Sequence, residues 1–143
     1  MDKSFYAKFP CCFRNALASG EVSFTTDPVT DFSQFEAFRG IFRAQESSFE
    51  DINRLDFLSQ AEMGRLYNPR FGQKESFYSC SVFLKFEECA KALVFPNEKN
   101  DRKIAVGPID SENGCIRVRE LDGHVDWWIY DSPKPFWKLF RVV

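Results

Sequence analysis

The stretch GCIRVRELDGHVDWWIYD, residues 114–131, contains two strand candidates separated by the turn dipeptide Asp122-Gly123. An Asp-Gly pair between two such runs is a strong hairpin signal, because both residues tolerate the positive φ angles of a two-residue turn. The run KIAVGPI (103–109) precedes this hairpin as another strand candidate, and FWKLFRVV (136–143) follows it. Since strand candidates gather late in a chain whose earlier part carries helix signals, the sequence predicts an α+β domain.

Helical patterns occur at three places before these strands. FRNALASG (13–20) predicts a short helix that ends at its glycine, because glycine readily takes the left-handed conformation at a helix C-terminus. A second helix is expected from residue 47 or 48, where a serine hydroxyl can cap it, to about residue 60. LKFEECAKALVF (84–95) is the clearest helix, and its spacing predicts a buried stripe on one side. The stripe consists of Phe86, Cys89, Ala90 and Leu93.

Two further segments have extended character. AFRGIFRA (37–44) alternates aromatic residues and glycine with arginine and isoleucine, which predicts a strand with one lining face. EVSFTTDP (21–28) alternates more weakly and is expected to form a short extended piece.

The composition is that of one globular domain spanning residues 1–143, in which residues 1–35 have no assigned role. Hydrophobic residues make up 44% and charged residues 28% of the chain, which excludes disorder as a description of the whole. The net charge is −2, and basic residues never form a run longer than two. Binding to duplex nucleic acid is therefore not expected.

The cysteines and the single histidine limit the cellular compartment and the kinds of metal site that are expected for this chain. Five cysteines is an odd number, and the opening residues MDKSFYAKFP lack the apolar core of a secretory signal, so we expect a reduced, cytoplasmic protein. No apolar run approaches the length of a membrane helix. His124 is the only histidine and there is no Cys-x-x-Cys pair, so a metal site built from histidine or cysteine is not expected. Buried, apolar positions are expected for Cys80, Cys89 and Cys115.

The segment GRLYNPRFGQKESFYSCS, residues 64–81, combines loop residues with chemistry-bearing side chains. Asn68-Pro69 favours a turn, and the two glycines allow unusual backbone angles. Phe77, Tyr78 and Ser79 are expected on a short strand from Ser76 to Cys80, which would place a ring and a hydroxyl on opposite faces. Arginine for phosphate, rings for a base and a hydroxyl for ribose are what a nucleotide pocket requires, and each is also common in ordinary turns and cores. The candidate ligand-binding residues here are Arg65, Tyr67, Asn68, Tyr78 and Ser79.

Arg43 and His124 each allow two interpretations. Arg43 follows Phe42 on the expected strand 37–44, where it is either an edge arginine with its charge in water or a phosphate clamp that uses the bidentate fork of its guanidinium. His124 follows a turn glycine. It is either a hairpin residue whose ring is partly exposed to solvent or a donor to a ribose hydroxyl. Trp127 and Trp128 are adjacent, so in a strand one points inward and the other outward, and an outward indole would indicate a contact surface.

The order of these features resembles the N-terminal half of RES-domain proteins, which have the ADP-ribosyltransferase fold and act on NAD. The resemblance covers about residues 38–95. It is carried by IFRA (41–44), GRLYNPRFG (64–72), FYSCS (77–81) and FEECAKAL (86–93). The chain departs from the family after residue 95, because fewer residues remain than the family normally has. The resemblance implies a curved, split antiparallel sheet flanked by two or three helices.

The resemblance also implies roles for particular residues. Arg43 and Arg65 would hold the pyrophosphate of NAD, and Tyr78 would flank the nicotinamide. Glu87 or Glu88 would stabilise the ribose cation as nicotinamide leaves or would activate an acceptor. The implied activity is ADP-ribosyl transfer or cleavage of the glycosidic bond of NAD by a toxin-like or effector-like enzyme, with a protein target or an antitoxin as its partner.

Two other hypotheses stay open beside this one. A non-catalytic binding protein, such as an immunity or adaptor protein, predicts a cleft filled by phenylalanines and an exposed Trp127 or Trp128. A nucleotide-sensing domain would bind NAD without turnover. The enzyme hypothesis requires Arg43, Tyr78 and one of the two glutamates to converge on one cleft.

Overall fold

The computed structural model describes residues 3–43, 52–93, 101–131 and 133–143 of the chain. Within these ranges the side chains of five residues lie outside the description. These are Phe42, Arg43, Phe71, Asp101 and Arg102.

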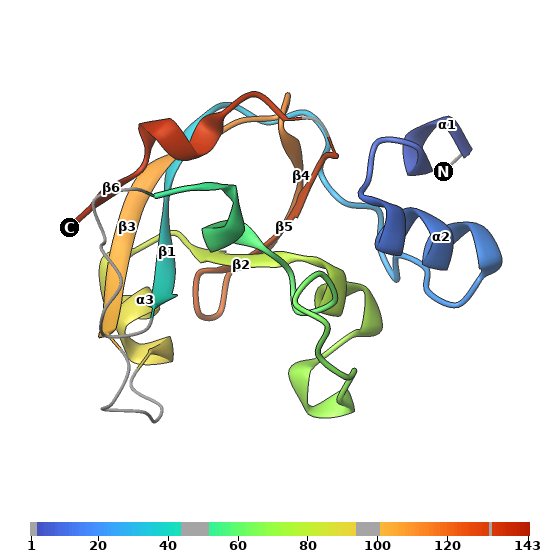
Figure 1. Cartoon of the computed structure of the whole chain (residues 1–143), viewed down its shortest axis with the longest axis horizontal. Coiled ribbons are helices and arrows are strands. Elements are labelled where there is room, and N and C mark those ends of the chain that lie inside the picture. Colours follow the sequence, from blue (N-terminus) through green and yellow to red (C-terminus); the bar gives the residue numbers. More distant parts are fainter. Residues whose placement is uncertain (1–2, 44–51, 94–100, 132) are drawn as a thin grey trace.

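The described residues form an α+β structure with one six-stranded open sheet and three α-helices (Figure 1). The strands are β1 (Phe35–Arg43), β2 (Cys80–Phe83), β3 (Asp101–Ile109), β4 (Gly114–Arg119), β5 (His124–Ile129) and β6 (Arg141–Val142). Their order across the sheet is β4-β5-β2-β1-β3-β6, and every neighbouring pair is antiparallel. The helices are α1 (Lys3–Tyr6), α2 (Cys11–Ser19) and α3 (Phe86–Ala92). The predicted α+β class is confirmed.

The sheet consists of two halves with a narrow join. In the described residues a single pair, Phe38 on β1 opposite Phe83 on β2, connects the half β4-β5-β2 with the half β1-β3-β6. Arg39 bridges the join from β1, since its guanidinium donates to the carbonyl of Ser81 on β2 at 2.9 Å and to the carbonyl of Asp56 at 3.1 Å. The half-buried arginine thus supplies donors where the strand ladder is short.

The two faces of the sheet carry separate apolar cores. Trp127, from β5, lies in the larger core, which also contains Phe57, Phe136 and Phe140. Trp128 points to the other face and packs among residues of α2 and the segment before it, including Phe13. Successive residues of a strand point to opposite faces, so the Trp-Trp pair serves both cores. Both indoles are buried, so the exposed tryptophan that the binding-protein hypothesis requires is not found.

Several predicted elements are confirmed with small shifts. α2 ends at Gly20, which has a φ of 79° and whose amide donates to the carbonyl of Leu17. The hairpin of β4 and β5 turns at Asp122-Gly123, where Gly123 has a φ of 65°. α3 is confirmed, but its predicted stripe is wrong at one end: Cys89 is fully buried, whereas Phe86 is 43% exposed.

Two predicted elements are wrong in the described residues. The helix expected to reach residue 60 is reduced there to a 3₁₀ helix, Arg54–Phe57, because Leu55 is 72% exposed and no continuous apolar face exists; its expected start lies outside the described residues. The strand expected from Ser76 is a 3₁₀ helix, Lys74–Tyr78, and β2 begins only at Cys80. The Ser79 hydroxyl donates to the carbonyl of Ser76 at 2.9 Å, and such local bonds compete with extended pairing.

The remaining segments are less regular than expected. Residues 21–28 contain no strand, although Val29 forms an isolated bridge with Ile116 of β4. The final run 136–143 forms a 3₁₀ helix, Phe136–Leu139, before β6. No described helix has the length and apolar character needed to cross a bilayer.

Candidate functional site

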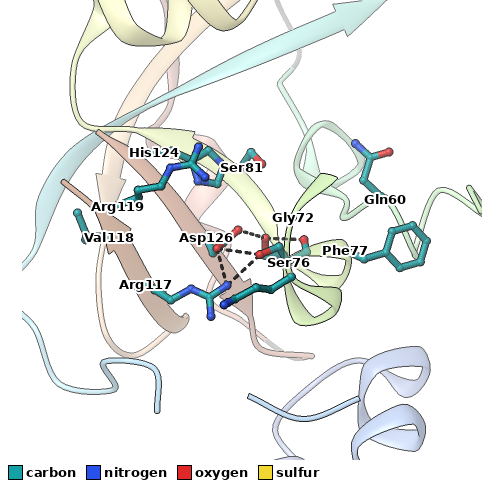
Figure 2. A pocket seen from close by; sticks show the side chains of 12 residues that line it. Gln60, Gly72, Ser76, Phe77, Ser81, Arg117, Val118, Arg119, His124 and Asp126 are labelled. Atoms are coloured by element: carbon teal, nitrogen blue, oxygen red, sulfur yellow. Dashed lines mark hydrogen bonds and ion pairs between the residues drawn. The ribbon is translucent and has the colours of Figure 1, made fainter. Parts of the chain in front are cut away.

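A groove lies on the face of the sheet to which Asp126 and Trp128 point, and α3 borders one end of it. Its larger part has a volume of about 480 Å³ and polar walls that include Ser76, Arg117 and Asp126 (Figure 2). Its smaller part, about 240 Å³, has more apolar residues in its lining, among them Leu58, Phe83 and Leu93 beside α3, and it also contains Arg39. The two parts share four lining residues, which mark their junction. These are Gln60, Ser79, Ser81 and His124.

The strand register explains why polar side chains meet in this groove. In an antiparallel sheet, residues directly opposite each other point to the same face. Ser81 on β2 and Arg117 on β4 both lie opposite Asp126 of β5. One step along the sheet, Phe83 and Arg119 both lie opposite His124. The residues of these two rows are Ser81, Asp126, Arg117, Phe83, His124 and Arg119. The two rows form the floor of the groove.

His124 and Ser81 form a hydrogen-bonded pair in the groove. The Nε2 atom of His124 lies 3.0 Å from the hydroxyl oxygen of Ser81, and the ring edge of Phe83 packs against the imidazole. Burial lowers the pKa of His124 below its ordinary value, and the carboxylate of Asp126 offsets this only in part. The imidazole is therefore neutral near pH 7 and can accept a proton. In the tautomer with its proton on Nδ1, Nε2 accepts the hydrogen bond from the Ser81 hydroxyl.

A network centred on Arg117 fixes the polar wall. Its guanidinium donates to Glu75 at 3.1 Å, to Asp126 at 3.0 Å and to the hydroxyl of Ser76 at 2.9 Å (Figure 2 shows the last two). Ser79 also donates to Asp126, at 2.7 Å. The 3₁₀ helix that carries Ser76 is thereby tied to the sheet, which keeps the wall of the groove in place.

Glu75 is a fully buried carboxylate in this network. Its Oε2 atom accepts from the backbone amide of Thr25 at 2.6 Å and from the Thr25 hydroxyl at 2.7 Å, besides the bond from Arg117. Burial acts to raise the pKa of Glu75, but the hydrogen bonds from Thr25 and Arg117 outweigh it, and the pKa is lowered. The carboxylate is ionised and belongs to the structural support of the groove.

Arg119 brings a second positive charge to the groove. Its guanidinium makes a bidentate pair with Asp122, at 2.9 and 2.7 Å, and this pair lowers the pKa of Asp122 to about 2. The Arg119 side chain is 62% exposed. It therefore has room to turn toward a ligand anion, since exposed ion pairs are weak.

The β4–β5 turn rests on α3. The Glu88 carboxylate lies against Gly123, where a Cβ atom would overlap it, and the Oε2 atom of Glu88 is buried without a hydrogen-bond partner. The amide of Leu84 donates to the carbonyl of Gly123 at 3.0 Å. This contact sets the position of the neighbouring His124.

The structure brings only some of the sequence-predicted site residues together. Ser79 and His124 both line the junction of the groove. Tyr78 does not line it: its ring stacks on Phe13 at 4.9 Å in the α2 core, and burial, together with the charge of Glu21, raises the pKa of its hydroxyl. The expected placement of Tyr78 and Ser79 on opposite faces of a strand is wrong, because Tyr78 ends a 3₁₀ helix and Ser79 is its C-terminal cap.

The other predicted residues lie at varied distances from the groove. Arg65, Tyr67 and Asn68 belong to an exposed loop that leads into its wall. Glu87 is exposed on α3, and Glu88 contacts the turn before His124. Arg43 pairs with Asp101 at the end of β1, and its side chain lies outside the described residues, so its convergence with Tyr78 and a glutamate stays a prediction.

Sequence reasoning missed Ser81, Arg117, Arg119 and Asp126 as members of the site. The signal was present in the alternation of IRVR and of HVD, which places their charged residues on one face of a hairpin. What the alternation does not reveal is that Ser81 joins them from a strand that pairs with β5 across a long sequence separation.

The cysteines take no part in the groove's hydrogen bonds. Burial raises the pKa of Cys89 to about 11 and that of Cys115 to about 12, and Cys80 is buried as well, so these thiols are protonated and unreactive, as their apolar positions predicted. Within the described ranges, no group of three or more histidine, cysteine, aspartate or glutamate side chains has the arrangement of a metal site.

Comparisons of the chain with known protein families, with curated proteins and with solved structures find no match.

Proposed function

We propose that the groove binds NAD and that the protein breaks the glycosidic bond to nicotinamide, passing ADP-ribose to water or to an acceptor. The observation that carries this proposal is the His124–Ser81 pair at the junction of a polar and a more apolar part of one groove. A ligand that spans the junction presents a bond between a polar and an apolar group to the pair. The bond between ribose and nicotinamide is of that kind.

The dimensions and walls of the groove suit such a ligand. Pockets of about 300–1,000 Å³ hold small molecules, and the larger part alone falls in this range at about 480 Å³. Nicotinamide, a flat ring, would enter the smaller part between Phe83 and Leu93, with the amide of Gln60 at the junction for its carboxamide. The pyrophosphate would meet Arg119, whose planar guanidinium suits bidentate contact with phosphate oxygens.

The chemistry follows from the charge of the groups at the junction. As the C–N bond breaks, nicotinamide leaves as a neutral molecule and the ribose becomes cation-like. The Asp126 carboxylate lines the groove, but its charge is paired with Arg117 at 3.0 Å, so we assign it the positioning of the groove wall and not the stabilisation of the ribose cation. The Ser81 hydroxyl takes the proton of the attacking water or acceptor hydroxyl as it gives its own proton to Nε2 of neutral His124 across their 3.0 Å contact.

The sequence gives independent support for the ligand class. Segment 64–81, in which a nucleotide pocket was expected, contributes Gly72, Gln73, Ser76, Phe77, Ser79 and Ser81 to the lining. The resemblance to RES-domain proteins supplies NAD as the dinucleotide. The enzyme hypothesis is preferred to the binding-protein hypothesis because Trp127 and Trp128 are both buried.

The test is to incubate the pure protein with NAD, follow free nicotinamide and record thermal unfolding with and without the ligand. We expect release and a higher Tm for the wild type. His124→Ala is expected to abolish release and Ser81→Ala to reduce it, whereas the exposed Ser33→Ala serves as the matched control and behaves like the wild type. A higher Tm without release would identify a sensor. No release and no shift in Tm would refute NAD as the ligand.

A further inference from the structure

A loop of exposed, ordered residues borders the mouth of the groove. Residues 63–70 are all exposed, and they include three large apolar side chains. Leu66 is 90% exposed, Met63 42% and Tyr67 36%. We call residues 63–74 the basic loop, because all of its charged residues are basic.

The basic loop has positive charges and no negative ones. The loop contains Arg65, Arg70 and Lys74 and no aspartate or glutamate, although the whole chain has a net charge of −2. Among the described residues neither arginine of the loop forms an ion pair, and the ammonium of Lys74 lies 3.9 Å from the Glu21 carboxylate, at the limit of such a contact. Three cations therefore surround exposed apolar side chains with little internal neutralisation.

Internal contacts hold the loop in one conformation. The Asn68 side chain accepts from the amide of Arg70 at 3.0 Å, and the Tyr67 hydroxyl donates to the carbonyl of Gly72 at 3.3 Å. The Tyr67 ring also packs edge-on against Phe77. A partner that binds this loop has little backbone entropy to remove, which favours binding.

We propose that the basic loop binds an acidic peptide segment of a partner protein, with Leu66 inserted beside an aliphatic side chain of that segment. Complementary charge selects the partner, because among the described residues Arg65 donates only to the neutral amide of Gln60, Arg70 has no ion pair, and Lys74 has only the 3.9 Å contact with Glu21. The most exposed side chain of the loop is the aliphatic Leu66, whereas the ring of Tyr67 packs against Phe77, which favours a peptide over a nucleic acid, whose bases stack on free aromatic faces. Gly72 and Gln73 line the groove, so a segment bound to the loop lies at the groove's mouth. The inference does not depend on the chemistry proposed for the groove.

The experiment measures binding of a fluorescein-labelled octapeptide of alternating acidic residues and leucine by fluorescence anisotropy, without NAD. The variants are Leu66→Ser and Arg70→Glu. The matched controls are Leu121→Ser, whose leucine is 94% exposed on another turn, and Arg141→Glu, on the exposed strand β6. Circular dichroism and Tm verify that each variant is folded.

We expect each loop variant to weaken binding about tenfold, a loss of about 1.4 kcal/mol, and each control to change it by less than about twofold. A peptide with serine in place of leucine is expected to bind more weakly to the wild type and equally to Leu66→Ser. Equal losses in the controls, or no binding of the peptide to the wild type, would overturn the proposal. Tighter binding of a labelled oligothymidylate through the same residues would overturn it in favour of a nucleic-acid surface.

Discussion

Replacing Arg117 with methionine is expected to lower the free energy of unfolding by about 3 kcal/mol, because it leaves two buried carboxylates without their cation. The side chains of Glu75 and Asp126 are only 1% and 8% exposed, whereas the Arg117 side chain is 21% exposed. Water therefore cannot replace the lost donors at either carboxylate. The variant also loses the contact of the guanidinium with the Trp128 ring, 5.2 Å from its centroid. For a domain of this size the expected fall in Tm is about 10 °C.

The assay is urea unfolding followed by tryptophan fluorescence, with Arg119→Met as the matched control. The Arg119–Asp122 pair has the same chemistry but is 62% and 46% exposed, so its removal is expected to cost less than about 1 kcal/mol. The Arg117→Met deficit is expected to shrink as the pH falls. In the wild type the lowered pKa of Glu75 contributes stability above its ordinary value of 4.5, and that stability is lost as the pH falls below 4.5. The variant loses the part of this contribution that comes from Arg117, whereas the hydrogen bonds from Thr25 remain. Equal losses for the two arginine variants would refute the reasoning from burial.

Three further predictions concern the turn, the histidine and the thiols. Gly123→Ala and Gly64→Ala are each expected to lower the free energy of unfolding by about 1 kcal/mol, because both glycines have a left-handed backbone and the Cβ at position 123 overlaps only the flexible end of the Glu88 side chain. Urea titrations of both variants test this, and a much larger loss for Gly123→Ala would show that Glu88 cannot move aside. Because the pKa of His124 is lowered on folding, the stability of the wild type is expected to decrease as the pH falls below 6.5. His124→Gln is expected to remove this dependence, which is measured as Tm against pH. An unchanged slope in the variant would contradict a lowered pKa of His124. Ellman's reagent is expected to modify the two exposed cysteines of α2 in the native protein and the three buried ones only after unfolding, and native modification of all five would show that the cores are open.

The elements that the sequence predicts well are those with local signals. The β4–β5 hairpin follows from one turn dipeptide between two alternating runs, and the end of α2 follows from one glycine. The incorrect elements lie in residues 52–80, where short polar side chains form local hydrogen bonds. There the Asn53 side chain accepts from the amide of Leu55 at 2.8 Å, and Ser79 donates to Ser76, so 3₁₀ turns replace the expected helix and strand.

Only some of the residues that line the groove can be predicted from the sequence. The composition of segment 64–81 predicts a ligand site and points to Ser79, and His124 is a candidate as the single histidine, but the sequence does not show the partner of either residue. Ser81 meets His124 because β2 pairs with β5, and that pairing depends on the apolar cores on both faces of the sheet. A sequence pattern gives the face on which a side chain lies and not the strand beside it.

The Arg117 network joins three parts of the chain that are synthesised far apart in time. Its bonds connect residues separated by 92, 50 and 42 positions: Arg117 with Thr25, Thr25 with Glu75, and Arg117 with Glu75. Contacts of such long range form late, because the loops between them must close first. A chain emerging from the ribosome therefore has no complete groove until β5 has left the exit tunnel. Ligand binding is in this way restricted to finished molecules, and a ligand that binds only the native groove protects the whole domain against unfolding.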